Sequence, residues 1–383
     1  MKIKILTLPF NWNYGGILQN FALQYILIKE GHVVETINRE NISGSLSQLL
    51  KSIVSRAIKK FLFRQKIKLR MFPDKKDLSI ICENTNNFVN ENIKISPRAY
   101  NDQDLKKIKE EKFDAIIVGS DQIWRPKYSN NINNHFLEFL NGHSAKRISY
   151  ASSLGSSQWE FNKVQTTEVK NLIQKFDAIS VREQSGAELL QKHFNSKAQN
   201  TLDPTLLVPA SVYESIASKN ISKIPENGLM TYILDGDEKK KELVQTCADK
   251  HNLEPFTCRQ KKYFHNMGDD PIDDCVAPPI EQWIDSFRKA KFIITDSYHG
   301  MIFSIIFNKP FIALANVKRG LSRFESLLKS FNIEDRLVTN IDAEAVRLID
   351  EKIDYDRVNE RLNKLRTESI NFLLDSLAAE HRD

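Results

Sequence analysis

The chain has 383 residues, of which 41% are hydrophobic and 27% are charged, and a formal net charge of +6. This length and composition suffice for a large core and for two domains. No stretch approaches the ~20 apolar residues of a membrane-spanning helix, and residues 1–16 lack the apolar region of a signal peptide, so we expect a cytoplasmic protein.

The cysteines show no CxxC spacing; they are Cys82, Cys247, Cys258 and Cys275. Because cytoplasmic cysteines stay reduced, we expect free thiols. Cys258, His265 and Cys275 are too loosely spaced for a typical zinc site. The sequence therefore predicts no bound metal and no cofactor.

The first predicted elements are a strand over residues 2–7, a helix over 17–29 and a strand over 32–37. In this βαβ start, Gly15 and Gly16 stand at the entry to the helix, where a bare backbone could come close to a ligand. The glycines could equally make only a tight turn. Neither a GxGxxG fingerprint nor a P-loop signature occurs in the chain.

Residues 51–70, which begin at Lys51 and end at Arg70, carry eight basic and no acidic side chains. Apolar residues recur among them near the helical period, which predicts an amphipathic helix. Such a helix could make a peripheral contact with the inner face of the membrane, or bind a polyanionic glycan or lipid diphosphate. A solvated face on a packed helix is the alternative. We do not expect nucleic acid as a partner, because no binding motif for it accompanies these charges.

Further strands are predicted over residues 113–119, 147–152, 176–181 and 198–202, with helices over 164–174 and 185–194 between them. This alternation indicates a largely parallel sheet. Polar residues follow each strand, and ligands of open α/β sheets bind outside the carboxyl ends of the strands. Turn residues and helix caps would leave the same pattern.

A linker is predicted over residues 204–228, followed by a second α/β unit. Its central stretch, residues 291–311, reads as strand, polar elbow, helix and strand, with His299 on the elbow. Free N–H groups at a helix start favour an anion there, although Asp296 or Ser297 could instead only cap the helix. A charged helix over 355–379 ends the chain and could fold back over the first domain. We therefore expect domains at residues 1–205 and 206–350 and a C-terminal helix within 351–383.

Seven segments resemble motifs of the polysaccharide pyruvyltransferase family, in the family's order. They are NYGGILQNFALQ (13–24), VGSDQIW (118–124), ISYASSLG (148–155), ISVREQSG (179–186), LDPTLL (202–207), TDSYHGMIFSIIFNKPF (295–311) and RGLSRFESLL (319–328). The resemblance implies two Rossmann-like domains that face a cleft, as in GT-B glycosyltransferases. Many family members carry Arg-Leu-His where this chain has Ser297, Tyr298 and His299, so an arginine expected near the donor is absent.

The resemblance also implies an activity, the transfer of the pyruvyl group of phosphoenolpyruvate to a sugar, usually as a ketal. The acceptor would be a surface polysaccharide or its lipid-linked oligosaccharide precursor. This reaction needs an acid for the donor's methylene carbon, a base for the sugar hydroxyl and a clamp for the donor's anions.

We assign His299 as the acid or phosphate ligand and Asp121 as the base. The candidates for donor binding are Arg323 first, and then Arg182, Lys318, Arg319, Ser297, Gly300, Gly15 and Gly16. On the acceptor side, Gln122 would help Asp121, and Trp124 could stack on the sugar ring, although a lone tryptophan is more often a core residue.

Two other functions fit the same sequence. A nucleotide-sugar-dependent GT-B glycosyltransferase would use a similar cleft and would respond to UDP or GDP. A catalytically silent glycan-binding protein would use the basic segment as its interaction surface. The arginine that is missing beside His299 keeps this last alternative open.

Overall fold

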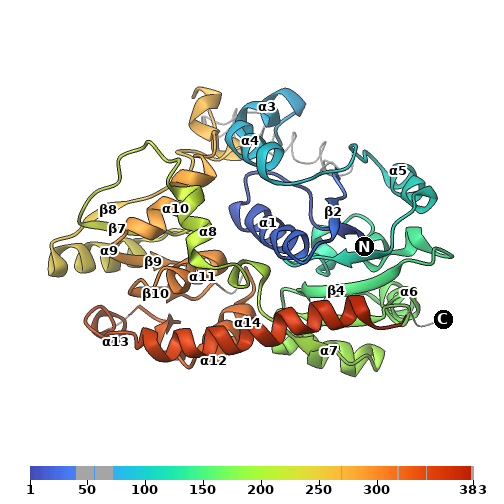
Figure 1. Ribbon diagram of the computed structural model, residues 1–383. Coiled ribbons are helices and arrows are strands. Elements are labelled where there is room, and N and C mark those ends of the chain that lie inside the picture. The colour runs from blue at the N-terminus through green and yellow to red at the C-terminus, as the bar shows by residue number, and fades with distance from the viewer. Residues whose placement is uncertain (40–55, 57–71, 269, 317–318, 342, 381–383) are drawn as a thin grey trace.

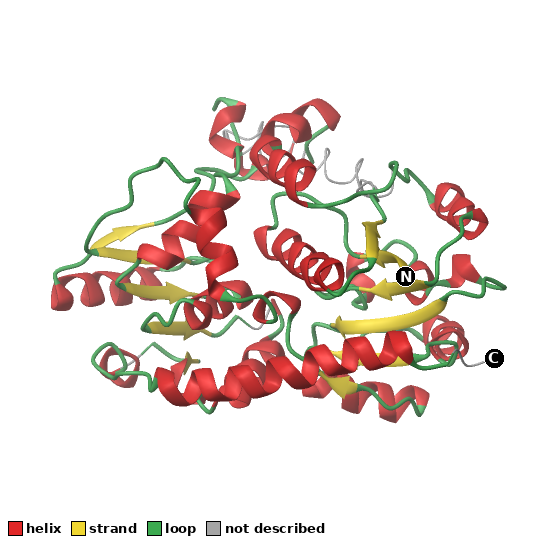
Figure 2. Ribbon diagram, in the orientation of Figure 1, coloured by secondary structure: helices red, strands yellow, loops and turns green. Residues whose placement is uncertain are grey.

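The structure is a computed structural model that describes residues 1–383 except 40–55, 57–71, 269, 317–318, 342 and 381–383. It contains two parallel sheets that lie side by side with helices packed around each, which confirms the predicted α/β class (Figures 1 and 2). The predicted basic helix over residues 51–70 lies outside the described residues except for Arg56, whose guanidinium donates to the carbonyl of His265 at 2.7 Å.

The first sheet has the strand order β2-β1-β3-β4-β5-β6. Its strands are β1 (Lys2–Leu6), β2 (Val33–Thr36), β3 (Ala115–Val118), β4 (Lys146–Ser152), β5 (Ala178–Val181) and β6 (Gln199–Asn200). The central strand β3 is buried at every position, as expected for a parallel strand covered on both faces. The helices of this half are α1 (Tyr14–Lys29), α3 (Lys75–Ile81), α4 (Glu83–Asn92), α5 (Asp102–Lys107), α6 (Lys163–Ile173) and α7 (Gln184–Phe194).

The second sheet has the order β11-β10-β9-β7-β8. Its strands are β7 (Gly228–Tyr232), β8 (Glu254–Phe256), β9 (Phe292–Thr295), β10 (Phe311–Leu314) and β11 (Leu337–Val338). The helices that follow the first half are α8 (Ala210–Ala217), α9 (Glu238–His251), α10 (Ile280–Lys289), α11 (Tyr298–Ile306), α12 (Leu321–Phe331), α13 (Ala343–Arg347) and α14 (Tyr355–Ala378).

Two predicted boundaries are wrong. Helix α1 begins at Tyr14 rather than at residue 17, so Gly15 and Gly16 lie in its first turn. The predicted linker contains helix α8, whose Tyr213, Ile216 and Ala217 are buried. These residues have helical spacing, but the serine and asparagine around them concealed that spacing in the composition.

Apolar contacts and the last helix join the two halves. Tyr14 of α1 stacks on Trp283 of α10, with the ring centroids 5.4 Å apart, and its hydroxyl donates to the carbonyl of Pro278 at 2.8 Å. Helix α14 runs along both halves (Figure 1), and its Ser369 hydroxyl accepts a hydrogen bond from the amide of Leu202 at 3.0 Å. Among the described residues, no helix is both long enough and apolar enough to cross a membrane.

Candidate active site

A cavity of about 940 Å³ opens between the two halves of the molecule. Its walls include the loops that follow β1, β3, β7, β8 and β9, together with residues next to and at the start of α12. Ligands of open α/β sheets bind at these carboxyl ends of strands. The residues that line the cavity include Asn13, Gly15, Asp121, Gln122, Asp235, Ser297, His299, Arg319 and Arg323.

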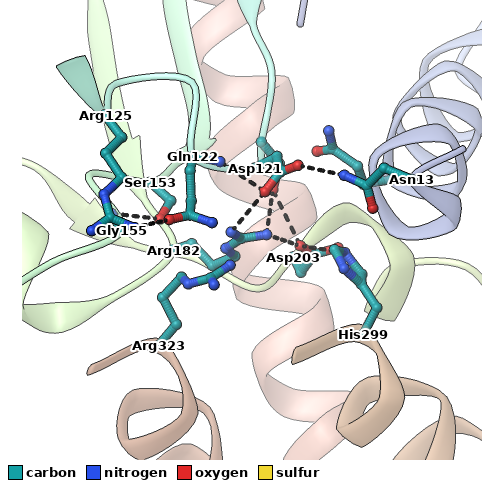
Figure 3. A network of polar contacts seen from close by, with 12 residues as sticks. Asn13, Asp121, Gln122, Arg125, Ser153, Gly155, Arg182, Asp203, His299 and Arg323 are labelled. Atoms are coloured by element: carbon teal, nitrogen blue, oxygen red, sulfur yellow. Dashed lines mark hydrogen bonds and ion pairs between the residues drawn. The ribbon is translucent and has the colours of Figure 1, made fainter. Parts of the chain in front are cut away.

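A buried ionic network connects the halves at this cavity (Figure 3). The guanidinium of Arg182, just after β5, donates to Asp203 at 2.8 Å and lies 3.5 Å from Asp121. From the other half, Nε2 of His299 lies 3.6 Å from the same Asp203 carboxylate. Burial would raise the pKa of Asp203, but the charges of His299 and Arg182 outweigh it and hold that pKa far below its ordinary value. Asp203 therefore stays ionised and holds His299 and Arg182 together.

Asp121 is held in a strained conformation. Its φ of 67° lies in the left-handed region, which a residue with a side chain adopts at some energetic expense. Its carboxylate accepts hydrogen bonds from the amide of Gln122 at 2.8 Å and from the side-chain amide of Asn13 at 3.1 Å. Burial would raise its pKa, but the nearby charges of Arg182, His299 and Arg323 lower it below the ordinary value. The cavity wall thus carries an oriented, ionised carboxylate.

Arg323, in the first turn of α12, is a buried cation that lines the cavity and points toward Arg182 (Figure 3). Both guanidinium groups lie against the ring of Tyr298, at 5.2 Å for Arg323 and 4.4 Å for Arg182. Arg323 donates to the carbonyl of Arg319, its Nε has no partner, and no carboxylate of the described residues lies within ion-pair distance of it. Burial, and then the charge of Arg182, lower its pKa to about 10. Among the described residues, Arg323 therefore has no carboxylate paired with it directly, although the charge of Asp121 acts on it from across the network.

His299, in the second half of the molecule, packs against Gly15 in the first half. A Cβ atom on Gly15 would lie 2.0 Å from Nδ1 of His299, so the imidazole occupies the space that the missing side chain leaves. The side chain is 9% exposed, and its Nε2, 3.6 Å from the Asp203 carboxylate, makes no hydrogen bond within 3.5 Å. An imidazole nitrogen held this loosely can still bind a ligand or transfer a proton to it.

The structure brings most of the predicted site residues to one cavity. His299, Asp121, Arg323, Arg319, Ser297, Gln122 and Gly15 line it, whereas Arg182 contributes from the buried network. Arg319 pairs with Asp235 at 2.7 Å. Lys318 lies outside the described residues. The catalytic and binding roles given to these residues stay predictions.

Several local roles differ from those predicted. Trp124 is 0% exposed, stacks on Phe136 and donates its indole N–H to the carbonyl of His135 at 3.0 Å, so the prediction that it stacks on a sugar is wrong. Ser297 caps α11 by accepting from the amide of Gly300 at 3.4 Å.

Two of the glycines predicted to bind the donor, Gly300 and Gly16, instead make room for neighbouring side chains. The missing side chain of Gly300 makes room for Thr295, and that of Gly16 for the amide of Asn13. Neither glycine is among the residues that line the cavity.

Sequence reasoning missed three contributors to the network. Asn13 orients Asp121, Asp203 holds His299 and Arg182, and the carboxylate of Glu183 accepts from the amides of Leu154 and Gly155 at 2.8 and 3.1 Å. Asp203 and Glu183 both directly follow predicted strands. A rule that ranks every carboxylate at a strand end as a candidate would have found these two.

Within the described residues, no group of three histidine, cysteine, aspartate or glutamate side chains is arranged to hold a metal ion. None of the four cysteines forms a disulfide within the described residues, and all four are buried. Burial raises the pKa of Cys82 to about 11 and that of Cys258 to about 12, so these two thiols are protonated at neutral pH and unreactive.

Comparison with known proteins places this site in a family. The family described as polysaccharide pyruvyl transferase matches residues 13–318. The chain belongs to this family. Its matched segment contains Asp121, Arg182, Asp203 and His299, whereas Arg323 lies just beyond it. A search of curated proteins gave no match.

Solved structures show the fold of this polysaccharide pyruvyl transferase family member. It is similar to the UDP-GlcNAc 2-epimerase of Neisseria meningitidis bound to UDP-GlcNAc, with a TM-score of 0.52 and 12% identity over 99% of this chain and 100% of that one. It is also similar to UGT89C1 of Arabidopsis thaliana complexed with UDP-L-rhamnose, with a TM-score of 0.51 and 8% identity over 99% of both chains. The predicted GT-B-like architecture is thereby confirmed.

Proposed function

We propose that this protein transfers the pyruvyl group of phosphoenolpyruvate to two hydroxyls of a sugar, forming a ketal and releasing phosphate. One observation carries the proposal, namely the buried guanidinium of Arg323, which lacks a carboxylate partner among the described residues and lines the same cavity as His299. A buried cation without a counter-charge is destabilising. The phosphate and carboxylate of phosphoenolpyruvate would supply that counter-charge.

In this mechanism, His299 donates a proton to the methylene carbon of the donor. The neighbouring carbon becomes an oxocarbenium centre, which the first sugar hydroxyl attacks while Asp121 accepts its proton. Phosphate then leaves, and the second hydroxyl attacks the same carbon to close the ketal. Of the two hydroxyl protons, one balances the proton that the methylene gained, and the other leaves with the phosphate. Arg182 and Asp203 position Asp121 and His299.

Arg323 replaces, in this proposal, the arginine that is absent beside His299. Position 297 holds a serine that caps α11, so α11 supplies no cation there. Arg323 reaches the cavity from α12 instead. A guanidinium suits this position because its planar donors can bind a phosphate or a carboxylate in bidentate fashion.

The proposal is tested by thermal unfolding with phosphoenolpyruvate, inorganic phosphate or UDP. A ligand at about 100 times its Kd stabilises the folded state by ~2.7 kcal/mol, which raises the midpoint by a few degrees. Phosphoenolpyruvate should shift wild type more than phosphate does. Arg323→Gln should weaken phosphoenolpyruvate binding by about ten- to a hundredfold, because it removes a charge-assisted contact.

His299→Ala should also reduce the phosphoenolpyruvate shift, because it removes a proposed ligand of the donor phosphate. The controls are His32→Ala, matched to His299→Ala, and Arg357→Gln, matched to Arg323→Gln. Both control residues lie outside the cavity, and Arg357 is exposed. They should leave the phosphoenolpyruvate shift unchanged. A full shift in Arg323→Gln would refute the role of Arg323, and a shift with UDP alone would favour the nucleotide-sugar glycosyltransferase.

A further inference from the structure

A second cavity, of about 640 Å³, adjoins the first. Pro9 and Tyr128 line both cavities, so the two cavities meet at these residues, which we call the shared wall. The proposed transfer does not use this second space, which lies where Pro9 follows β1 and Arg39 follows β2. Its other lining residues are mainly amides, including Asn101, Gln103, Asn130 and Asn131. The amide of Asn131 is engaged by Asp102 and Asn133, and the oxygen of Asn101 caps α5. Gln103 and Asn130 offer side-chain amides that can both donate to and accept from hydroxyl groups.

Arg39 lines this second cavity and points one guanidinium nitrogen at a buried histidine. The distance from its Nη1 to Nε2 of His135 is 2.5 Å, and Nδ1 of His135 lies 2.7 Å from the carbonyl of Ile123. Since a carbonyl can only accept, Nδ1 carries the proton and Nε2 accepts from Arg39. Burial, and then the charge of Arg39, lower the pKa of His135 to about 3, so the ring is neutral. This contact uses one N–H of Arg39 and neutralises none of its charge.

No carboxylate in the part of the chain that the structure describes pairs with Arg39. Asp102 also lines the cavity, but its two oxygens accept from Asn131 at 3.0 Å and from Asn134 at 2.7 Å, and it lies beyond ion-pair distance of Arg39. An arginine has five N–H donors. Arg39 therefore keeps its charge and most of its donors available to a ligand in the cavity.

The shared wall carries one further cation. Lys127 lies over the ring of Tyr128, 5.4 Å from its centroid, and Tyr128 is 46% exposed. Arg125 lies over the same ring at 5.4 Å, but its charge is paired with Glu160 at 2.7 Å. A half-exposed aromatic ring beside a set of amides is suited to the apolar face and the hydroxyls of a sugar. The adjacent charge of Lys127 favours a sugar that is negatively charged.

We infer that this second cavity holds the acceptor, and that the acceptor is a sugar bearing a phosphate or carboxylate group that Arg39 binds. The inference rests on the proposed function, because the sugar must extend past Pro9 and Tyr128, which line both cavities, to present its hydroxyls to Asp121. Arg39 would select the acceptor by its charge, and the amides would orient its ring.

Binding is measured by calorimetry, without donor, using N-acetylglucosamine 1-phosphate and glucuronate as anionic sugars and N-acetylglucosamine as the neutral one. The variants are Arg39→Gln and Gln103→Glu. The second places a negative charge on an exposed lining residue in the first turn of α5, where an acidic side chain does not disturb folding. Lys163→Gln is the control, because it removes one charge at an exposed residue that lines neither cavity.

At least one anionic sugar should bind wild type about tenfold or more tightly than the neutral sugar. Both variants should lose about ten- to a hundredfold of that affinity, and the control should lose none. The ratio between the two anionic sugars then identifies the anion as phosphate or carboxylate. Arg39→Gln should also be no less stable than wild type without ligand, because it removes a half-buried charge that lacks a carboxylate partner among the described residues.

Equal binding of charged and neutral sugars, no sugar binding at all, or an unaffected Arg39→Gln would each overturn the inference. So would a loss of phosphoenolpyruvate affinity in Arg39→Gln, because Arg39 would then belong to the donor site. If wild type failed to bind phosphoenolpyruvate but still bound the anionic sugar through Arg39, the proposed function would fail while the anionic sugar site would stand.

Discussion

Replacing Gly15 by alanine should disable His299 without changing its imidazole. The new Cβ would lie 2.0 Å from Nδ1, 2.4 Å from Cγ and 2.5 Å from Cε1 of that ring. Packed heavy atoms stay about 3.5 Å apart, so the ring must move by roughly 1 Å or more. A misplacement of about 1 Å at a reacting group can lower a rate by ~100-fold.

Gly15→Ala should lose some stability but still fold. Alanine favours a helix over glycine by about 0.5–1 kcal/mol, and crowding at one packed site typically costs about 1–3 kcal/mol. We therefore expect the free energy of unfolding to fall by no more than about 2.5 kcal/mol. The decisive assay is phosphate release from phosphoenolpyruvate in the presence of the acceptor, measured as kcat/KM beside a thermal unfolding curve.

Gly236→Ala is the matched control, because Gly236 lines the same cavity and an added Cβ would meet no atom within 4 Å. It should behave as wild type. If Gly15→Ala kept kcat/KM within about threefold of wild type, then the position of His299 would not govern the reaction, and its assignment as the acid would be refuted.

Three other substitutions test the network and the core. Asp203→Asn should lower the free energy of unfolding by about 3–5 kcal/mol at neutral pH, because it leaves Arg182 buried without its partner. The pKa of Asp203 is lower in the folded than in the unfolded state, so the ionised carboxylate stabilises the fold above the unfolded pKa of about 3.9, and this stabilisation is lost as the pH falls. The difference in unfolding midpoint between Asp203→Asn and wild type should therefore shrink below about pH 4. Trp124→Phe should lower the free energy of unfolding by about 1–3 kcal/mol through the lost bond to His135, yet leave the acceptor KM unchanged; a raised KM would restore the stacking role. Gly320→Ala should weaken both stability and phosphoenolpyruvate binding. The φ of Gly320 is 91°, and a Cβ there would lie 2.3 Å from the carbonyl oxygen of Gly155, so the substitution should displace α12 and Arg323. Unaltered phosphoenolpyruvate binding would show that α12 tolerates the shift.

The local pattern of the sequence determined the elements and most of the site's parts. Short apolar runs followed by polar residues predict buried parallel strands whose ends carry ligands, and this pattern alone assigns Asp121 and His299 to the carboxyl ends of strands. Such patterns depend on neighbours two to four residues away, which is the range over which strand and helix periodicity acts. The α/β class was therefore predictable from the sequence, and so were the candidates for acid, base and clamp.

Tertiary structure alone decided which charges are neutralised. The sequence gives no sign that Arg182 and Arg323 differ in pairing. In the structure Arg182 is paired with Asp203, whereas Arg323 has no carboxylate partner among the described residues. The same holds for Arg39, whose histidine partner lies 96 residues away, and for Trp124, whose ring is covered by elements distant in the chain. Electrostatic pairing and burial act through space, and a single sequence carries no periodic signal for contacts at such separation. The cations without a carboxylate partner in the described part of the chain, which we propose as anion-binding groups, are therefore defined only by the packing of the two halves.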